Sequence, residues 1–354
     1  MYFLVSGNTP QFYPAETFFG LICFSENEAV EIPYQYPLLG EWGSPISSIF
    51  NEPNNFPTPT RLDLVYLSII EGCFYSLESS ISVDRFNKCW EVIYSTINND
   101  ELPYVITGLA PYGMVALWIM NSKKSFLIGY YKAKMIQVEM KDFRPSFPQV
   151  SLNDICKRYI ETYPSVKDNL ENNGLPPCDL FDNYMKQFTY RYQVDFRHWE
   201  EENKEWKSDN QSTRKEENLK SEAEFDYIEE ALFDGTHDKL HDGGLMNYHQ
   251  AGKPKKLAIK WHVKKSEYTA YFWFEDEGIH SVFDKFYGVH PEIKVDLLIR
   301  IDPEKNKYEL SLYRCGLREP QVISENVYQL LVFKNKFERF RSDNYNQERG
   351  AWIW

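Results

Sequence analysis

Short apolar segments bounded by turn residues recur through both halves of this 354-residue chain. In the first half, LDLVYLSI (62–69) and CFYSLE (73–78) predict two strands joined by a turn. The next segment, SVDRFNKCWEVIYSTI, predicts a helix, because Ser82 can cap it and apolar side chains recur at spacings of three and four. Those apolar side chains are Phe86, Cys89, Trp90, Ile93 and Ile97. Further strand-type segments follow at 104–110, 114–120, 126–131 and 134–140.

The second half has a similar order of segments. Two strand-type segments, LAIKWHV and YTAYFWF, precede a short helical pattern, GIHSVFDKFYG. Three more strands are predicted at 293–301, 307–314 and 327–333, the first two joined by the turn sequence DPEKN. The first half has four predicted strands after its helix and the second half three, so the order strand, strand, helix, strand, strand, strand is common to both. We therefore expect an α+β fold of two domains, each an antiparallel sheet with a packed helix. A ββαβββ pseudo-repeat and a chance recurrence of a common motif both remain open, because the residues themselves align poorly.

An acidic segment separates the two halves. SLNDICKRYIETY predicts a helix in which Ser151 and Asp154 form a capping pair. From Asp195 to Asp234 there are 14 acidic and 6 basic residues, and we expect an exposed helical connector. The inward stripe of this connector would consist of Phe225, Ile228, Leu232 and Phe233. The predicted division is therefore an N-terminal domain over 1–148, the connector over 149–250 and a C-terminal domain over 251–354.

Charge and composition narrow the classes of function. The formal net charge of −13 excludes sequence-independent binding to nucleic acid, which needs clustered lysine and arginine. Aromatic residues make up 16% of the chain, enough for dense cores and for amphipathic contact surfaces. An acidic protein suits a basic protein partner, although solubility alone also explains the charge.

The cysteines and the N-terminal segment bear on location. The six cysteines show no CxxC pair, which favours reduced thiols in a cytosol over a disulfide framework. The first 24 residues lack a basic start and carry Pro10, Pro14 and Glu16, so we expect no secretion signal. No apolar run reaches the roughly 18 residues that a membrane helix needs. The sequence therefore predicts a cytoplasmic protein that does not bind a membrane.

The segment GTHDKLHDGGLMNYHQAG contains three of the seven histidines. His237, His241 and His249 could form a zinc-like set, with Asp242 as an alternative ligand. The segment lacks the HExxH pattern, and its glycines favour a loop over a helix. We therefore expect a solvated linker and no metal or other cofactor.

Motifs for other chemistry are also weak. The chain has no GxSxG elbow and no Gly-rich phosphate loop, and Ser212 with Lys215 forms an SxxK only within the most polar stretch. A hydrolase that uses scattered carboxylates, or a metal on the histidine segment, remains the alternative from another class.

Two segments carry a resemblance to a known family. PTPTRLDLVYLSIIEGCFYSLE (57–78) and YVITGLAPYGMVALWI (104–119) resemble the bacterial family called domain of unknown function 2931. The resemblance covers residues 10 to 140, and the C-terminal NYNQERGAWIW is similar to the longer members. The matching positions are Ser68, Glu71, Phe74, Tyr75, Gly108, Pro111 and Gly113. On physical grounds Gly108, Pro111 and Gly113 suit a constrained turn between buried strands, and we expect Ser68 and Glu71 to bond the adjacent backbone.

The resemblance implies a function in protein binding. It carries no catalytic residues, but members are often encoded near toxin-secretion loci, and several look like immunity proteins that neutralise a type VI effector. Shorter relatives commonly carry a lipoprotein signal, and this chain departs from that pattern. We therefore expect a non-enzymatic protein that occludes a toxin with a basic surface.

Within that function, the expected contact residues lie in the acidic segment. A charge run of this kind is usually a solvated face, but Trp199 and Trp206, seven residues apart within it, keep a binding surface open. The predicted partner-binding residues are Glu200, Glu201, Glu202, Glu205 and Trp206. A structural adaptor is a third alternative.

Overall fold

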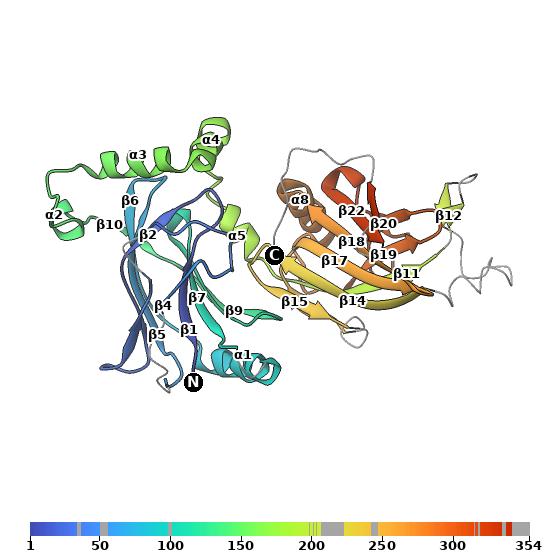
Figure 1. Cartoon of the computed structure of the whole chain (residues 1–354), viewed down its shortest axis with the longest axis horizontal. Helices are drawn as coiled ribbons and strands as arrows, with labels where there is room; N and C mark the ends of the chain where they lie inside the picture. The colour runs from blue at the N-terminus through green and yellow to red at the C-terminus, as the bar shows by residue number, and fades with distance from the viewer. Residues whose placement is uncertain are drawn as a thin grey trace. The chain divides into compact units, whose positions relative to one another are not determined.

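The computed structural model describes residues 1–33, 37–49, 56–97, 101–197, 199–200, 202, 204–206, 223–241, 247–314, 316–317, 319–334 and 338–341 (Figure 1). The fold is α+β, as predicted, and most of its regular structure is antiparallel strand. The chain divides into two compact units. The first consists of Met1–Met185 with Asp234–His237, and the second of Lys186–Phe233 with Asp238–Trp354. The residues predicted as a connector, 149–250, are thus shared between both units.

The first unit contains two five-stranded sheets. Sheet A has the order β4-β1-β7-β8-β9, in which β1 and β7 are parallel and the other pairs antiparallel. Sheet B has the order β10-β6-β5-β2-β3 and is antiparallel throughout. The strands of sheet A are β1 (Leu4–Asn8), β4 (Ser47–Ile49), β7 (Tyr104–Leu109), β8 (Met114–Met120) and β9 (Ser125–Lys132). Those of sheet B are β2 (Ala15–Cys23), β3 (Ala29–Glu31), β5 (Arg61–Ser68), β6 (Cys73–Ser80) and β10 (Lys134–Ile136).

The main core of the first unit lies between sheets A and B. Alternate residues of β5 and β8, such as Leu64 and Leu117, are buried in one cluster, as the two-residue period of a strand requires. Helix α1 (Val83–Thr96) adds Phe86 and Ile93 to this cluster. Its start at Ser82, whose side chain accepts from Arg85 N–H, confirms the predicted cap.

Short helices cover the outer faces of both sheets in the first unit. Phe143 of α2 (Met140–Phe143) and Cys156 of α3 (Leu152–Thr162) pack on Phe74 of sheet B. Phe181 of α5 (Leu180–Tyr184) packs against Trp118 of sheet A. Ser151 caps α3 by accepting from Asp154 N–H, as predicted. The unit also contains α4 (Pro164–Asn173) and the 3₁₀ turn η1 (Pro111–Gly113).

The second unit is also built on two sheets. Sheet C has the order β16-β11-β19-β20-β21, with β11 and β19 parallel. Sheet E has the order β15-β14-β17-β18-β22-β23. The strands of sheet C are β11 (Phe188–Phe196), β16 (His249–Ala251), β19 (Val295–Asp302), β20 (Lys307–Tyr313) and β21 (Gln321–Val322). Those of sheet E are β14 (Ala223–Leu232), β15 (His237–Leu240), β17 (Pro254–Val263), β18 (Ser266–Phe274), β22 (Tyr328–Lys334) and β23 (Glu338–Arg341).

Aromatic rings join the two sheets of the second unit. Trp261 and Phe272 of sheet E lie with ring centroids 6.3 and 6.5 Å from Tyr308 of sheet C. Helix α8 (Asp276–Tyr287) buries Phe283 against Phe188 of β11. The unit also contains the 3₁₀ turn η3 (Glu325–Val327) and a small separate hairpin of β12 (Trp199–Glu200) and β13 (Glu205–Trp206).

The helical prediction for the acidic segment is wrong where the structure describes it. Residues 188–196 and 223–232 are strands of sheets C and E. Charged residues suit a helix by propensity, but Ile228, Glu230 and Leu232 alternate inward, and the pairing of β14 with β17 overrides the propensity. Each unit also has two main sheets rather than the single sheet expected. The strand predicted over 134–140 ends at Ile136.

Of the helices that the structure describes, none combines the length and the apolar character needed to cross a bilayer.

Candidate functional site

The predicted partner-binding residues lie on the β12–β13 hairpin of the second unit. Glu202 and Glu205 are exposed, and Glu200 and Trp206 are partly buried. Glu201 lies outside the described residues. The acidic run EEENKEW (200–206) was expected to be an exposed helix, but Trp199 and Trp206 face each other directly across the hairpin. Their rings meet edge to face with centroids 5.2 Å apart, which is a stabilising cross-strand pair.

Side-chain bonds hold the β12–β13 hairpin against β19 and β20. Trp206 Nε1 donates to Glu309 at 2.9 Å, and Trp199 N–H donates to the Asp302 carboxylate at 2.7 Å. The Lys307 ammonium lies 5.1 Å from the Trp199 ring centroid. The two tryptophans therefore fix the position of the hairpin, while Glu202 and Glu205 face solvent.

The three histidines considered as candidate metal ligands, His237, His241 and His249, lie on strands or beside them. His237 begins β15 and His249 begins β16, so the linker prediction is wrong for 237–240, which form an edge strand of sheet E. His241 lies with its ring 5.8 Å from that of Tyr227. No group of three or more His, Cys, Asp and Glu side chains suited to a metal occurs among the residues that the structure describes. Asp242 lies outside those residues.

The turn before β15 belongs to the first unit and has a defined geometry. The buried Asp234 carboxylate accepts from Thr236 N–H at 2.9 Å and from its hydroxyl at 2.6 Å. Trp118 Nε1 donates to the Asp234 carbonyl, and His237 N–H donates to Ser125 Oγ at 2.8 Å. Residues 235–237, the start of the glycine-rich histidine segment, thus belong to a docked turn of the first unit.

Three of the positions that carry the family resemblance, Ser68, Glu71 and Tyr75, form a hydrogen-bonded cluster in the first unit. The Glu71 carboxylate accepts from Ser68 Oγ at 2.7 Å, from Tyr75 OH at 2.9 Å and from Tyr112 N–H at 2.9 Å. The β5–β6 turn is thereby bonded to the β7–β8 turn, where Tyr112 has a positive φ of 59°. Burial and the Glu71 carboxylate raise the pKa of Tyr75. The predicted bond to backbone is confirmed for Glu71, through Tyr112 N–H, whereas Ser68 bonds the Glu71 side chain instead.

Two glycines of the same motif allow close approach. A Cβ on Gly108 would lie 2.4 Å from the Trp118 ring, and one on Gly113 would lie 2.5 Å from the carbonyl oxygen of Ala133. Gly113 also has a φ of 74°, which L side chains rarely adopt. Both positions are therefore structural.

A buried polar cluster that no sequence pattern indicated lies in the second unit. Tyr192 OH donates to Glu230 at 2.5 Å, and His249 Nε2 lies 4.0 Å from the other oxygen of that carboxylate. Burial and then the Glu230 charge raise the pKa of Tyr192. Glu230 lies in a run of charged residues, so it was expected to be exposed. It points inward only because the run is a strand, in which alternate side chains are buried. The cluster joins β11, β14 and β16 across the core.

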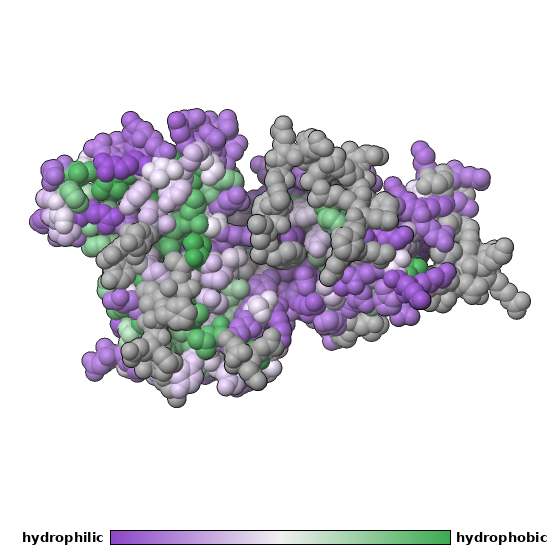
Figure 2. Space-filling view, in the orientation of Figure 1, coloured by the Kyte–Doolittle hydropathy of each residue, from purple (hydrophilic) through white to green (hydrophobic). Residues whose placement is uncertain are grey.

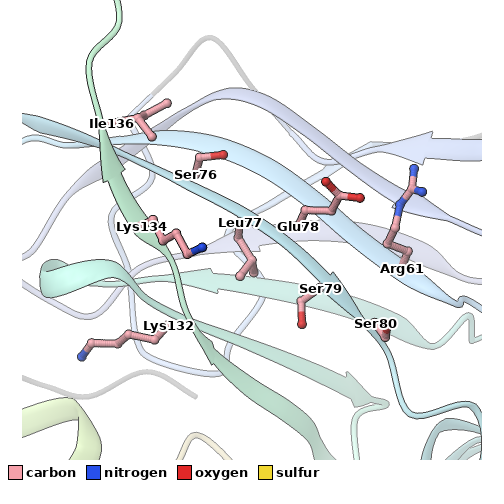
Figure 3. A pocket seen from close by; sticks show the side chains of 9 residues that line it. All are labelled: Arg61, Ser76, Leu77, Glu78, Ser79, Ser80, Lys132, Lys134 and Ile136. Atoms are coloured by element: carbon pink, nitrogen blue, oxygen red, sulfur yellow. The ribbon is translucent and has the colours of Figure 1, made fainter.

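A groove of about 470 Å³ lies beside β6 in the first unit (Figure 3). Lys132 of β9 and Lys134 of β10 line it, and Arg61 lies at its far end next to Ser80. In Figure 3 the Lys134 side chain is directed toward Leu77, whereas that of Lys132 extends away from β6. The remaining lining residues are Ser76, Leu77, Glu78, Ser79, Ser80 and Ile136. No sequence motif marked this groove.

Comparison with protein families identifies the first unit. The family described as "Protein of unknown function (DUF2931)" matches residues 2–176. This part of the chain is a DUF2931 domain. The match contains β1 to β10, the Glu71 cluster and both motif glycines, and so confirms the family resemblance seen in the sequence. No curated protein and no solved structure matches the chain.

Proposed function

We propose that this protein acts by binding another protein, with the β12–β13 hairpin as part of the contact surface. The observation that carries the proposal is the bracing of this hairpin by Trp199 and Trp206. Because the strands Trp199–Glu200 and Glu205–Trp206 are held before any partner arrives, little conformational entropy of these strands is lost on binding. Hydrophilic residues gather where Figure 1 places β12 (Figure 2).

The chemistry of the hairpin favours a basic partner. Glu202 and Glu205 are exposed on a chain with a net charge of −13. Opposite charges speed encounter and discriminate against acidic competitors, while affinity comes from a few buried contacts. Trp206 is half-buried next to the two glutamates and supplies an aromatic edge for such a contact.

For the identity of the partner, we propose a secreted antibacterial effector that this protein neutralises by covering it. The support is membership of the first unit in DUF2931, together with the expectation that members serve as immunity proteins for type VI effectors. Occlusion requires no catalytic residue in the inhibitor, only a surface that fits the toxin.

We further propose that the second unit is a diverged copy of the DUF2931 domain. Its support is strand order: β4-β1-β7-β8-β9 corresponds position by position to β16-β11-β19-β20-β21. The order β10-β6-β5-β2-β3 corresponds in the same way to β22-β18-β17-β14-β15. In both units a parallel pair, β1 with β7 and β11 with β19, falls at the same place. An experimental structure in which the second unit had another strand order would contradict the duplication.

Native mass spectrometry of the protein purified from its own host, with neighbouring genes intact, tests the binding function. We expect a discrete complex with a second polypeptide that dissociates at high salt, because exposed charge pairs are screened. A single polypeptide that carries a stoichiometric transition metal would contradict the proposal and favour the hydrolase. A partner that is not a toxin would favour the structural adaptor.

A further inference from the structure

Strand β6 has an incompletely paired outer edge in the DUF2931 domain. On one side it pairs with β5 over its whole length, from Cys73 to Ser80. On the other side, β10 pairs only with Phe74, Tyr75 and Ser76. Among the described residues, no strand pairs with this outer side of Leu77–Ser80.

The second unit shows what a filled edge looks like at the corresponding position. There β22 pairs antiparallel with β18 from Tyr268 to Phe274, through seven consecutive residue pairs. The corresponding strand of the first unit, β10, begins only at Lys134, because the preceding residues still belong to β9. The place that the first half of β22 fills in one unit is therefore a groove in the other (Figure 3).

The groove presents both backbone and side-chain groups. In an antiparallel pair, every second residue directs its N–H and C=O toward the partner strand, so Leu77–Ser80 can form about four backbone hydrogen bonds. Leu77 is only 8% exposed and lines the groove together with Ile136. These two apolar side chains can receive alternate side chains of an added strand.

The cations of the groove favour an acidic occupant. Lys134 is exposed, and the Lys132 side chain is 53% exposed. Lys132 lies 3.7 Å from Asp182, a solvent-exposed ion pair that is weak and easily exchanged. At the far end, Arg61 is already bonded to Asp63, and Glu78 lies opposite Asp63 on the neighbouring strand. The attraction for carboxylates is therefore concentrated at Lys132 and Lys134.

We propose that the β6 edge of the DUF2931 domain binds an extended acidic segment of a partner protein by β-strand addition. The segment continues the line of β10 along Leu77–Ser80, antiparallel to β6, with carboxylates directed at Lys132 and Lys134. A second copy of this chain fits less well, because pairing β6 with itself brings the same lysines of both copies together. This site is separate from the β12–β13 hairpin and does not depend on it.

Selection from a random decapeptide library, displayed on phage, against the full-length protein tests this inference. We expect enriched peptides to carry Asp or Glu at alternating positions. In fluorescence anisotropy, Lys132→Glu with Lys134→Glu should weaken their binding at least tenfold. The matched control is Lys157→Glu with Lys167→Glu, which makes the same charge change on α3 and α4 and should alter affinity less than twofold.

Two further readouts separate strand addition from attraction between charges alone. Methylation of alternate backbone amides of the peptide should abolish binding, because it removes the donors that the edge requires. Hydrogen exchange should slow at residues 77–80 in the complex. The inference is overturned if no peptide prefers the wild type over the double variant, or if the methylated peptide binds equally well. Lysines at a sheet edge can also serve only to prevent pairing with other chains. Self-association of the double variant, with no peptide selected by the wild type, would show that role and overturn the inference.

Discussion

The indole Nε1 of Trp118 donates a 2.9 Å hydrogen bond to the backbone carbonyl of Asp234, 116 residues later in the chain. The following residue, Gly235, lies against Gly43, so that a Cβ on Gly235 would stand 2.9 Å from the Gly43 Cα atom. Both glycines have positive φ, 83° at Gly43 and 82° at Gly235. A segment that appears in the sequence as a polar linker is therefore fitted against a buried tryptophan of sheet A.

Replacement of Gly235 by alanine should be clearly destabilising. Alanine is strained at positive φ, and its methyl group would collide with Gly43 and with the Trp118 ring, so we expect a loss of about 2–4 kcal/mol. Gly72→Ala is the matched control. Gly72 has a φ of 63° and no atom within 4 Å of its Cβ position, so alanine there should cost only about 1 kcal/mol. Urea denaturation followed by tryptophan fluorescence measures both. Equal losses would show that the contact with Gly43 contributes nothing.

Loss of the Glu71 carboxylate should loosen the joined turns of the DUF2931 domain. Glu71→Ala removes the acceptor of three hydrogen bonds, and we expect a loss of about 2–3 kcal/mol. Ser68→Ala removes only one donor and should cost about 1 kcal/mol. The exposed Glu28 makes a suitable control, because Glu28→Ala changes the charge equally and should leave the unfolding midpoint unchanged. If Glu71→Ala and Glu28→Ala have the same unfolding midpoint, the Glu71 hydrogen bonds do not stabilise the two turns.

Strand and helix positions were predictable where the local pattern agrees with the packing. The cap at Ser82, the strand alternation of 62–68 and the hairpin at 293–314 all agree between sequence and structure. The segment around Glu230 was not predictable, since its charges suit a helix and only pairing with β17 makes it a strand. The second sheet in each unit was missed for a related reason, because sheet membership depends on contacts between residues far apart in sequence.

The candidate site was only partly predictable. Two tryptophans seven residues apart mark the acidic run in the sequence, but their spacing is that of a helix. The hairpin register that pairs Trp199 with Trp206 depends on contacts with β19 and β20. The groove beside β6 left no local signal, because it results from the early end of β10. A missing strand partner is a property of the sheet and not of any motif.

A buried lysine in the second unit gives a pH-dependent prediction. The Lys253 side chain is fully buried, and its ammonium lies 3.1 Å from Asp284, which also contacts Lys186 at 3.3 Å. Burial lowers the pKa of Lys253, although Asp284 opposes the shift. Asp284→Asn should cost about 1–3 kcal/mol at neutral pH, whereas Lys253→Met should be within about 1 kcal/mol of the wild type.

The sign of the pH effect follows from that lowered pKa. Between the folded pKa of Lys253 and its unfolded value, the unfolded chain binds more protons, so stability rises with pH. We expect the loss in Asp284→Asn to shrink between pH 7 and pH 9.5, as measured by urea denaturation at each pH. A loss that stays constant or grows would show that Lys253 is not charged and buried as the contacts indicate.

Tyr192 should make stability fall, rather than rise, with increasing pH in the alkaline range. Burial raises its pKa well above the ordinary value of 10.0, so the unfolded chain releases this proton first and stability falls as pH rises past about 10. Tyr192→Phe should cost about 1–3 kcal/mol at pH 7 by removing a donor to Glu230. The same variant should show a weaker loss of stability between pH 9 and pH 11, when denaturation midpoints are compared. If stability falls with pH as steeply in Tyr192→Phe as in the wild type, Tyr192 is not a source of the alkaline loss of stability.

The affinity of charge-reversed variants for the co-purified partner tests the central claim most directly. Glu202→Lys with Glu205→Lys should weaken binding at least tenfold while leaving the melting temperature unchanged, because both side chains are exposed. Glu26→Lys with Glu28→Lys, an equal charge change on the exposed β2–β3 turn, should keep the affinity within twofold. Full affinity in the hairpin variant, or equal losses in both, would contradict a contact made by the β12–β13 hairpin.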